Sequence, residues 1–316
     1  MKITVIGCGR WGTFIAWYLD KIGHSVSLYG RKSSAHMQKL IETRTNGLVE
    51  LPETLTNSLD AVKDSDVIVI SVNSQGLRGL MHELQPFELK NKIFVLCMKG
   101  VEIETGMRLS QVCAAECDNS NAVAVWVGPG HVQEFAAGVP NCMVIDSDSE
   151  DAKKTLVESF GSDLIRFYYG QDLIGNEIGA AAKNVVGIAA GMLDGLGLST
   201  LKGALMARGT REIARLIDAL GGNELSAYGL CHLGDYEATL FSPYSHNRMF
   251  GEKFVKNEPY TDLAEGYYAV DALLRLGKTV SADLPICRAV YNVLYKGENA
   301  HDEVNALFTR SIKNEF

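Results

Sequence analysis

Three features are missing from this 316-residue chain, and each absence narrows what it can be. The seven cysteines are scattered without a C-x-x-C pair, which indicates reduced thiols rather than a disulfide framework or a zinc site. No charge-free apolar run reaches the roughly 18 residues that a membrane-spanning helix needs. The net charge of −8 argues against a general binder of nucleic acid or anionic membranes. An apolar strand beginning at Lys2 also leaves no room for a secretory signal, so we expect a cytoplasmic protein.

The chain opens with a strand, a glycine turn and a helix. An apolar run at 3–6 is followed by Gly7, Gly9 and Gly12 in a GxGxxG pattern, then by a helical pattern and a second strand at 25–29. In this context Gly7 permits a tight turn, Gly9 lets a pyrophosphate approach, and Gly12 allows close helix packing. The phosphates would lie at the helix N-terminus, where N–H groups and the helix dipole favour anions. The pattern therefore predicts dinucleotide binding, the alternative being a glycine turn without a ligand.

The end of the second strand bears on the choice of cofactor. It reads Tyr29-Gly30-Arg31-Lys32, without the carboxylate that binds the ribose 2′-hydroxyl of NAD. A basic residue there suits the 2′-phosphate of NADP, so Arg31 is a candidate cofactor contact, with a solvated loop as the alternative. The sequence predicts NAD(H) and/or NADP(H), with a lean toward accepting NADP.

Apolar strands alternate with helical patterns as far as Gly170. We expect strands at 3–6, 25–29, 67–72, 93–97, 122–127, 143–146 and 164–168, with helices between them. This alternation indicates an α/β fold with a Rossmann-type, doubly wound and mostly parallel sheet. Beyond Gly170 the patterns predict helices at 175–197, 201–220, 223–232, 247–256, 261–276, 283–295 and 302–310. The expected domains are a dinucleotide-binding domain at 1–174 and an all-helical substrate-binding and catalytic domain at 175–316.

The stretch 175–197 combines small apolar residues with one lysine. Gly and Ala dominate it, which suits a helix that its neighbours approach closely, although each interior Gly costs about 1 kcal/mol of helix propensity. Lys183 lies in its middle and must be partnered, snorkelling or functional. A lysine can exchange a proton with substrate when burial and a second positive charge lower its pKa, and Lys99 is the candidate second cation. Without a chemical role, Lys183 would be a surface lysine on a packed helix and Lys99 an ordinary lysine in a turn.

Eight segments match a known family in order and spacing. They are VIGCGRWGT, CMKGVEIETG, VGPGHVQEFAAGVP, IGNEIGAAAKNVVGIAAGMLDGLG, HLGD, SHNRMFG, AEGYYAV and LPICRAVYNVLY. On these segments the chain resembles the bacterial NAD(P)-dependent glycerol-3-phosphate dehydrogenases over nearly its whole length. The resemblance implies interconversion of sn-glycerol 3-phosphate and dihydroxyacetone phosphate, which supplies the backbone of glycerophospholipids.

The resemblance also implies roles for individual residues, with no metal. Lys183 matches the proton acceptor at the substrate C2 oxygen, and Lys99 and Asp235 line the same substrate. The segment at 245–248 would hold the phosphate at a helix start, because a phosphate wants helix N–H groups and a cation. The implied substrate contacts are Lys99, Gly128, Gly130, Lys183, Asp235, Ser245, His246, Asn247 and Arg248. The expected cofactor contacts are Gly7, Gly9, Arg10, Trp11, Gly12, Arg31, Lys99, Val132, Leu263 and Glu265.

Three positions depart from the family pattern. His246 stands where the family usually has Arg, and an imidazole lacks the bidentate fork of a guanidinium; Arg248 is a candidate to compensate. Gly130 stands where the family commonly has a threonine that touches substrate. Arg10 replaces a small residue in the glycine loop and could reach a cofactor phosphate. These departures bear on the affinity for substrate and on its identity.

Two other functions stay open. A 2-hydroxyacid or ketopantoate-type reductase shares the glycine loop and a helix lysine but would lack the phosphate-holding segment. A catalytically inactive NAD(P)-binding sensor would need none of Lys99, Lys183 and Asp235. The expected partner is a small phosphate ester, and the sequence leaves open whether the chain forms a homodimer.

Overall fold

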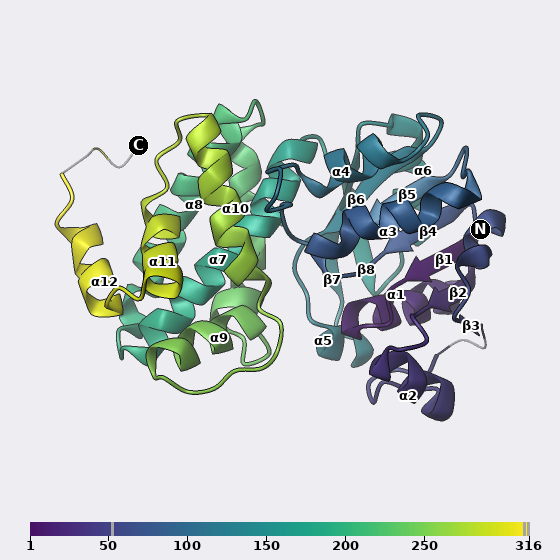
Figure 1. Ribbon diagram of the computed structural model, residues 1–316, viewed down its shortest axis with the longest axis horizontal. Coiled ribbons are helices and arrows are strands. Elements are labelled where there is room, and N and C mark those ends of the chain that lie inside the picture. The colour runs from purple at the N-terminus through teal and green to yellow at the C-terminus, as the bar shows by residue number, and fades with distance from the viewer. Residues whose placement is uncertain (52–53, 312–313, 315–316) are drawn as a thin grey trace. The chain divides into compact units, whose positions relative to one another are not determined.

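The computed structural model describes residues 1–51, 54–311 and 314, and the chain forms two compact units. One unit comprises residues 1–102 and 107–177, and the other comprises residues 103–106 and 178–316. The division falls within the long helix α7, Leu173–Gly195 (Figure 1). Within the described residues, no helix is both long enough and apolar enough to cross a membrane.

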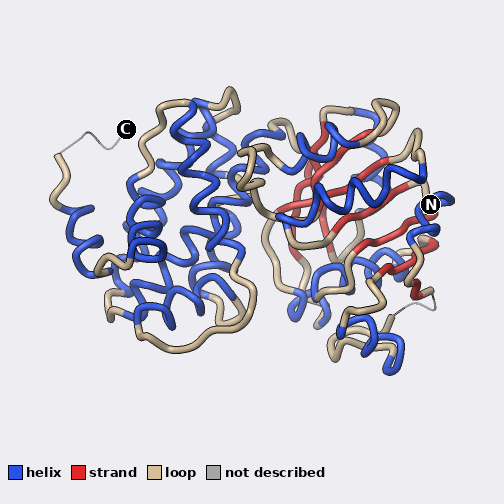
Figure 2. The backbone as a smooth tube through the Cα atoms, in the orientation of Figure 1, coloured by secondary structure: helices blue, strands red, loops and turns tan. Residues whose placement is uncertain are grey.

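The first unit is built on an eight-stranded sheet in the order β3-β2-β1-β4-β5-β6-β7-β8, whose strands are the red segments of the tube in Figure 2. Its neighbours pair in parallel except β6 and β7, which are antiparallel. The sequence-based expectation of a mostly parallel sheet is therefore confirmed. The strands are β1 (Lys2–Ile6), β2 (Ser25–Tyr29), β3 (Leu55–Thr56), β4 (Val67–Ile70), β5 (Ile93–Leu96), β6 (Ala122–Val127), β7 (Asn141–Ser147) and β8 (Ile165–Tyr169).

The parallel central strands β1, β4 and β5 end in register, and β6 runs two residues further, so their carboxyl ends lie along one edge of the sheet. Ile6 of β1 lies beside Ile70 of β4, which lies beside Leu96 of β5, which lies beside Val125 of β6. The strand order reverses between β1 and β4, which is the switch point where open α/β sheets bind their ligands. The loops that follow these four strands are therefore the place to look for a cofactor site.

Helices cover both faces of this sheet (Figure 1). Helix α1 packs on β2 and α5, whereas α3 and α4 pack on each other. The side chains between α1 and the sheet include the fully buried rings of Phe14, Tyr18 and Trp126. These helices are α1 (Arg10–Lys21), α2 (Ala35–Thr43), α3 (Leu77–Leu84), α4 (Leu109–Glu116), α5 (Val132–Ala136) and α6 (Glu150–Phe160).

The second unit contains helices throughout its described part. Helix α11 packs on α8, α10 and α12, and α9 packs on α10. They are α8 (Lys202–Ala219), α9 (His246–Val255), α10 (Glu265–Thr279), α11 (Pro285–Lys296) and α12 (Ala300–Phe308) in addition to α7.

Helix α7 is packed through its glycines. A Cβ at Gly191 would lie 1.9 Å from the carbonyl oxygen of Arg248, and one at Gly251 of α9 would lie 2.1 Å from that of Ile188. The two helix backbones therefore touch directly, as the small residues of 175–197 predict. A Cβ at Gly266 of α10 would lie 2.5 Å from the carbonyl oxygen of Asn184, so α10 approaches α7 just as closely. The cost of glycine in a helix is offset here by contacts that no larger residue permits.

The segment before α9 differs from the helix expected at 223–232. It forms a 3-10 helix at Glu224–Tyr228, a second 3-10 turn at Leu233–Asp235 and a π-helical turn at Glu237–Phe241. Gly229 lies between the two 3-10 segments in an extended conformation and interrupts the helical pattern. The segment carries Asp235 at the end of its second turn.

Candidate functional site

The glycine turn after β1 requires glycine at two positions for steric reasons. Gly7 has a φ of +117°, and a Cβ there would lie 2.1 Å from the carbonyl oxygen of Ser71. A Cβ at Gly12 would lie 2.0 Å from the carbonyl oxygen of Gly7. By contrast, a Cβ at Gly9 would meet no atom within 4 Å, so the space beside Gly9 is open. The turn thus has the shape that lets a pyrophosphate approach its backbone.

The N-terminus of α1 adds the electrostatic part of this cradle. Gly9 is its N-cap and provides no side chain to occupy the free N–H groups of the first turn, which also contains no carboxylate. These N–H groups and the helix dipole suit an anion. Arg10 is the exposed first residue of α1, and the half-buried Trp11 has its ring 6.2 Å from that of Phe135. The residues present therefore fit a dinucleotide.

Arg31 follows β2, where the ribose of a bound dinucleotide is expected. Its guanidinium donates to Glu83 of α3 at 2.5 Å, and both side chains are exposed. The exposed pair is a weak one, because solvent-exposed ion pairs contribute about 0–1 kcal/mol. Arg31 is therefore in place as a cation, with a carboxylate neighbour that a 2′-phosphate would have to displace.

The loops after β5 and β6 are tied together by Lys99. Its ammonium donates to the carbonyl oxygen of Gly128 at 2.7 Å. Gly128 has a φ of +134°, and a Cβ there would lie 3.0 Å from Cα of Met143, so glycine is required for the loop to fold back in this way. The structure thus brings together two of the residues predicted from sequence, Lys99 and Gly128, at the carboxyl edge of the sheet.

Gly130 departs from the family pattern for a visible reason. Its φ is +135°, and a Cβ would lie 2.4 Å from the ring of Phe135. A threonine would be both strained and in collision with that ring, so this loop has no room for the family's usual side chain. Val132, the first residue of α5, is buried beneath the same loop.

Lys183, in the middle of α7, makes a buried ion pair with Asp235. The ammonium lies 2.8 Å from Oδ2 of Asp235 and donates to Oγ1 of Thr239 at 2.8 Å. The lysine is 9% exposed and the aspartate 1% exposed. Removing two charges from water costs several kcal/mol, so a buried pair is weak evidence for stability and better evidence for a chemical role. The sequence-predicted residues Lys183 and Asp235 are in direct contact.

The start of α9 is joined to α7 beside this pair. Asn247 donates through Nδ2 to Oδ1 of Asn184 at 3.0 Å and accepts at Oδ1 from the amide of Gly266 at 2.9 Å. Ser245 is the N-cap of α9, and its hydroxyl accepts from the amide of Arg248 at 3.3 Å. The N-terminus of α9 therefore lies next to the residue that follows Lys183.

The two basic candidates at this helix start are already engaged. Arg248 donates to Asp194 and Glu252, at 3.0 Å each, and its Nε donates to the carbonyl oxygen of Ser242. A phosphate bound by this guanidinium would therefore compete with two carboxylates. His246 hydrogen-bonds through Nδ1 to the hydroxyl of Tyr260 at 2.7 Å.

The remaining predicted contacts lie at the start of α10. Glu265 is its first residue and is partly buried, whereas the preceding Leu263 is 48% exposed. Within the described residues, no cluster of three or more His, Cys, Asp and Glu side chains could hold a metal ion.

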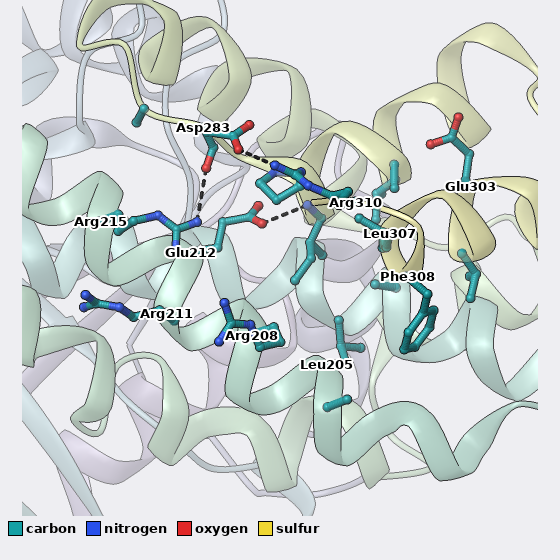
Figure 3. Close-up of a pocket in the computed structure, with 18 of the residues that line it drawn as sticks. Leu205, Arg208, Arg211, Glu212, Arg215, Asp283, Glu303, Leu307, Phe308 and Arg310 are labelled. Atoms are coloured by element: carbon teal, nitrogen blue, oxygen red, sulfur yellow. Dashed lines mark hydrogen bonds and ion pairs between the residues drawn. The ribbon is translucent and has the colours of Figure 1, made fainter. Parts of the chain in front are cut away.

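A cavity of about 1030 Å³ in the second unit lies among other residues (Figure 3). Apolar side chains of α7, α8, α11 and α12 line it, with Arg215 and Arg310 reaching Asp283 across its rim. Glu212 of α8 accepts there from the amides of Ile286 and Cys287, at the start of α11. None of the site residues predicted in this unit is among the described residues that line this cavity.

Two functional candidates were missed from sequence. Thr239 accepts from the Lys183 ammonium, and Asn184 orients Asn247. Thr239 lies four residues after Asp235, but the sequence predicts no helix over this segment, so no local pattern identifies it. Asn184 is adjacent to Lys183 in the sequence, but its partner lies 63 residues away and leaves no local pattern.

Comparison with known proteins covers both units of the chain. Residues 2–153 match the family model for the NAD-dependent glycerol-3-phosphate dehydrogenase N-terminus, and residues 172–305 match that for the C-terminus. A glycerol-3-phosphate dehydrogenase (NAD(P)+) of Prosthecochloris aestuarii is 35% identical, with 100% of both chains covered. The corresponding protein of Exiguobacterium sp. is 36% identical, with 99% of this chain and 97% of that protein covered.

Solved structures agree with this assignment. The crystal structure of glycerol-3-phosphate dehydrogenase from Coxiella burnetii has a TM-score of 0.90 and 27% sequence identity, with 98% of this chain and 99% of that chain covered. A 2-dehydropantoate 2-reductase from Methylococcus capsulatus has a TM-score of 0.60 and 20% identity, with 99% of each chain covered, and so shares the fold alone. The glycine cradle, the buried lysine pair and both family models agree: the chain belongs to the NAD-dependent glycerol-3-phosphate dehydrogenase family.

Proposed function

We propose that this protein interconverts sn-glycerol 3-phosphate and dihydroxyacetone phosphate, with NAD(P) as the hydride carrier. The observation that carries the proposal is the buried Lys183–Asp235 pair, in a chain that matches both family models. The relatives that cover the whole chain are named as NAD(P)+ enzymes, which supports the use of either cofactor. The reaction would supply the glycerol phosphate backbone of phospholipids.

The bound nicotinamide cofactor supplies or accepts the hydride, and the chain supplies the proton transfer. We assign Lys183 as the group that donates a proton to the C2 oxygen during reduction and accepts it during oxidation. Asp235 holds this lysine charged and, with Thr239, fixes two of its three N–H directions. The ammonium can then present its proton in a defined direction, which is the condition for efficient transfer.

The start of α9 is the proposed phosphate site. Its free N–H groups and dipole favour a dianion, and Ser245, His246 and Asn247 lie at this end of the helix. Asn247 is fixed by its bonds to Asn184 and Gly266, so the helix start has a set position relative to Lys183. His246, which hydrogen-bonds to Tyr260, and Arg248, which pairs with two carboxylates, are the side chains proposed to face the phosphate.

The cofactor residues are assigned to the predicted dinucleotide-binding domain, residues 1–174, and the catalytic residues to the helical domain, residues 175–316. Gly7, Gly9 and Gly12 shape the pyrophosphate cradle, and the proposed cofactor contacts around them are Arg10, Trp11, Arg31 and Val132, with Leu263 and Glu265 from the helical domain. Lys99, Gly128 and Gly130 are proposed substrate contacts from the sheet edge. Lys99 supplies a second positive charge for an anionic substrate.

We also propose that the protein is cytoplasmic, and its net charge of −8 supports the absence of a nucleic-acid partner. We further propose that the chain forms a homodimer. Light scattering of the purified protein tests the homodimer directly.

The test of the function is turnover of dihydroxyacetone phosphate with NADH and with NADPH. We expect both activity and a loss of about 10²-fold to 10⁴-fold in kcat for Lys183→Ala, the range contributed by general acid–base groups. Lys153→Ala is the matched control, because Lys153 is also buried and paired, with Glu150, but lies in α6. Turnover of ketopantoate in place of dihydroxyacetone phosphate would favour the reductase alternative. Cofactor binding without turnover of either ketone would favour the sensor.

A further inference from the structure

A second buried polar pair lies beside Asp235. His232 and Tyr236 are both fully buried, and the Nε2 atom of His232 lies 2.7 Å from the hydroxyl of Tyr236. The Nδ1 atom of the same imidazole lies 2.9 Å from the carbonyl oxygen of Gly179 in α7. Neither residue belongs to the predicted site, and a buried polar network of this kind is costly unless every member is bonded.

The geometry fixes the protonation of this imidazole. The carbonyl of Gly179 can only accept, so Nδ1 of His232 carries the proton and Nε2 accepts from the hydroxyl of Tyr236. Burial lowers the pKa of His232 to about 4, so the ring stays neutral at the pH where enzymes of this kind work. Its charged neighbours are Asp235, which favours the imidazolium, and Lys183, which opposes it.

The carbonyl that His232 reaches is also the one that anchors Lys183. In an α-helix the carbonyl of residue 179 accepts the amide of residue 183, so the ring bonds one turn below the lysine, on the same helix. The contact is tight, because a Cβ at Gly179 would lie 3.0 Å from Cβ of His232. The segment 232–239 therefore contacts α7 through a neutral hydrogen bond from His232 to Gly179 and through the ion pair of Asp235 with Lys183.

The residues of this segment divide between the two contacts by helical spacing. His232 and Tyr236 are four residues apart and bond to each other, and His232 also donates to the carbonyl of Gly179. Asp235 and Thr239 are also four residues apart, and both contact the Lys183 ammonium. The amide of Asp235 donates to the carbonyl of His232 at 3.0 Å, which couples the two sets through the backbone.

We propose that His232 and Tyr236 are positioning residues that hold Asp235 against the Lys183 ammonium. The neutral pair fixes the backbone of Leu233–Asp235 on α7, and the carboxylate then meets the lysine at one distance and one angle. Loosening the pair lets Asp235 withdraw, and the ammonium then releases its proton more readily because it loses its counter-charge. The proposal rests on the assignment of Lys183 as the proton-transfer residue.

The experiment measures kcat and KM for sn-glycerol 3-phosphate oxidation against pH in three variants of the full-length protein. Tyr236→Phe removes one hydroxyl, His232→Leu removes both ring bonds, and His232→Asn keeps a donor at the position of Nδ1. We expect Tyr236→Phe to lower kcat about 5-fold to 10-fold, with KM unchanged. The acid limb of its rate profile should move by about half a pH unit to lower pH. His232→Leu should exceed this effect, and His232→Asn should recover part of it.

Tyr18→Phe is the matched control. Tyr18 is also fully buried, and its hydroxyl donates to the carbonyl of Phe160, but it lies in α1 of the other unit. It should lose comparable stability while keeping the wild-type pH profile. If the variants at 232 and 236 also keep that profile at a similar loss of stability, the pair has only a structural role and the proposal fails. If His232→Leu does not fold, Tyr236→Phe decides alone. Wild-type turnover in Lys183→Ala would instead overturn the assignment of the lysine.

Discussion

The glycine turn after β1 and the cluster around Lys183 depend on different parts of the chain: the first on backbone shape and the second on buried side chains. The proposed cofactor cradle after β1 depends on backbone shape, because a Cβ at Gly7 or Gly12 would meet other backbone atoms whereas one at Gly9 would meet open space. The site around Lys183 is a matter of buried side-chain charge, in which an ammonium, a carboxylate and a hydroxyl are held in mutual contact. A larger side chain should therefore disrupt the glycine turn, whereas loss of one partner should disrupt the cluster around Lys183.

This difference also explains why these two regions tolerate change differently. A cradle of backbone N–H groups recognises any pyrophosphate, whichever side chains surround it, as long as the glycines remain. A buried ion pair depends on each partner, because deleting one leaves the other charged in a dry interior. The proposed proton transfer thus depends on specific charged side chains, whereas the proposed pyrophosphate binding depends on backbone N–H groups.

Single added methyl groups should separate shape from ligand contact within the cradle. Gly7→Ala should lower the free energy of unfolding by about 2–4 kcal/mol, because its φ is positive and its Cβ collides with Ser71. Gly9→Ala should leave stability within about 1 kcal/mol but weaken NADH binding about tenfold, because its Cβ enters the space meant for pyrophosphate. Urea denaturation and fluorescence titration measure the two effects. Unchanged NADH affinity in Gly9→Ala would contradict a cofactor role for the cradle.

The second comparison is between two buried titratable side chains, Glu212 and His232, neither of which is assigned to proton transfer. Glu212 is buried and caps the start of α11, and burial raises its pKa to about 7. The folded protein then holds a proton that the unfolded chain loses near pH 4.5, so this group's stabilisation is present below that pH and lost by pH 7. His232 acts in the opposite direction, since its pKa falls from 6.5 to about 4 and its contribution is lost as the pH falls through that range. Each effect amounts to about 3 kcal/mol, so the two largely cancel in the wild type.

Replacing either Glu212 or His232 should reveal the pH dependence of stability that the other one causes. Glu212→Gln should make the free energy of unfolding fall more steeply than in the wild type as the pH is lowered from 7 to 4.5, by about 3 kcal/mol over the range. His232→Leu should show the reverse slope, with stability rising toward pH 4.5 relative to the wild type. Denaturant titrations at intervals of half a pH unit measure both slopes. Curves parallel to that of the wild type would show that neither group titrates in this range.

The smallest effect is expected at the proposed phosphate site, at the start of α9. His246→Arg should lower the KM for dihydroxyacetone phosphate about 3-fold to 10-fold with kcat unchanged, because a guanidinium gives a permanent charge and a bidentate fork. His82→Arg is the control, since it adds the same side chain at an exposed position beside Glu116 in the other unit. Steady-state kinetics decide the matter, and an unchanged or higher KM would remove position 246 from the phosphate site.

Local patterns were enough to predict much of the fold. The strand expected at 122–127 has the bounds of β6, and helices lie between the strands as expected, with Ser34 capping α2 and Ser149 capping α6. The segment 223–232 was not predicted correctly as a helix, since its conformation depends on Gly229 and on the burial of His232 rather than on local propensity.

The site divides in the same way. The glycine cradle could be predicted from spacing alone, because neighbouring residues build it. The contact of Lys183 with Asp235 joins residues 52 positions apart and came only from the resemblance to a family. The capture of Arg248 by Asp194 and Glu252 was not foreseen, because Asp194 lies 54 residues earlier in the sequence and only the packing of α9 on α7 brings it near.

The glycine seam between α7 and α9 limits how this enzyme can be altered. Where the two backbones touch at Gly191 and Gly251, there are no side chains to repack and so no graded way to move one helix along the other. The distance between Lys183 and the start of α9 is therefore fixed by contact between the two helix backbones. Attempts to broaden substrate length by directed evolution should therefore succeed at 245 and 246, and fail along the seam.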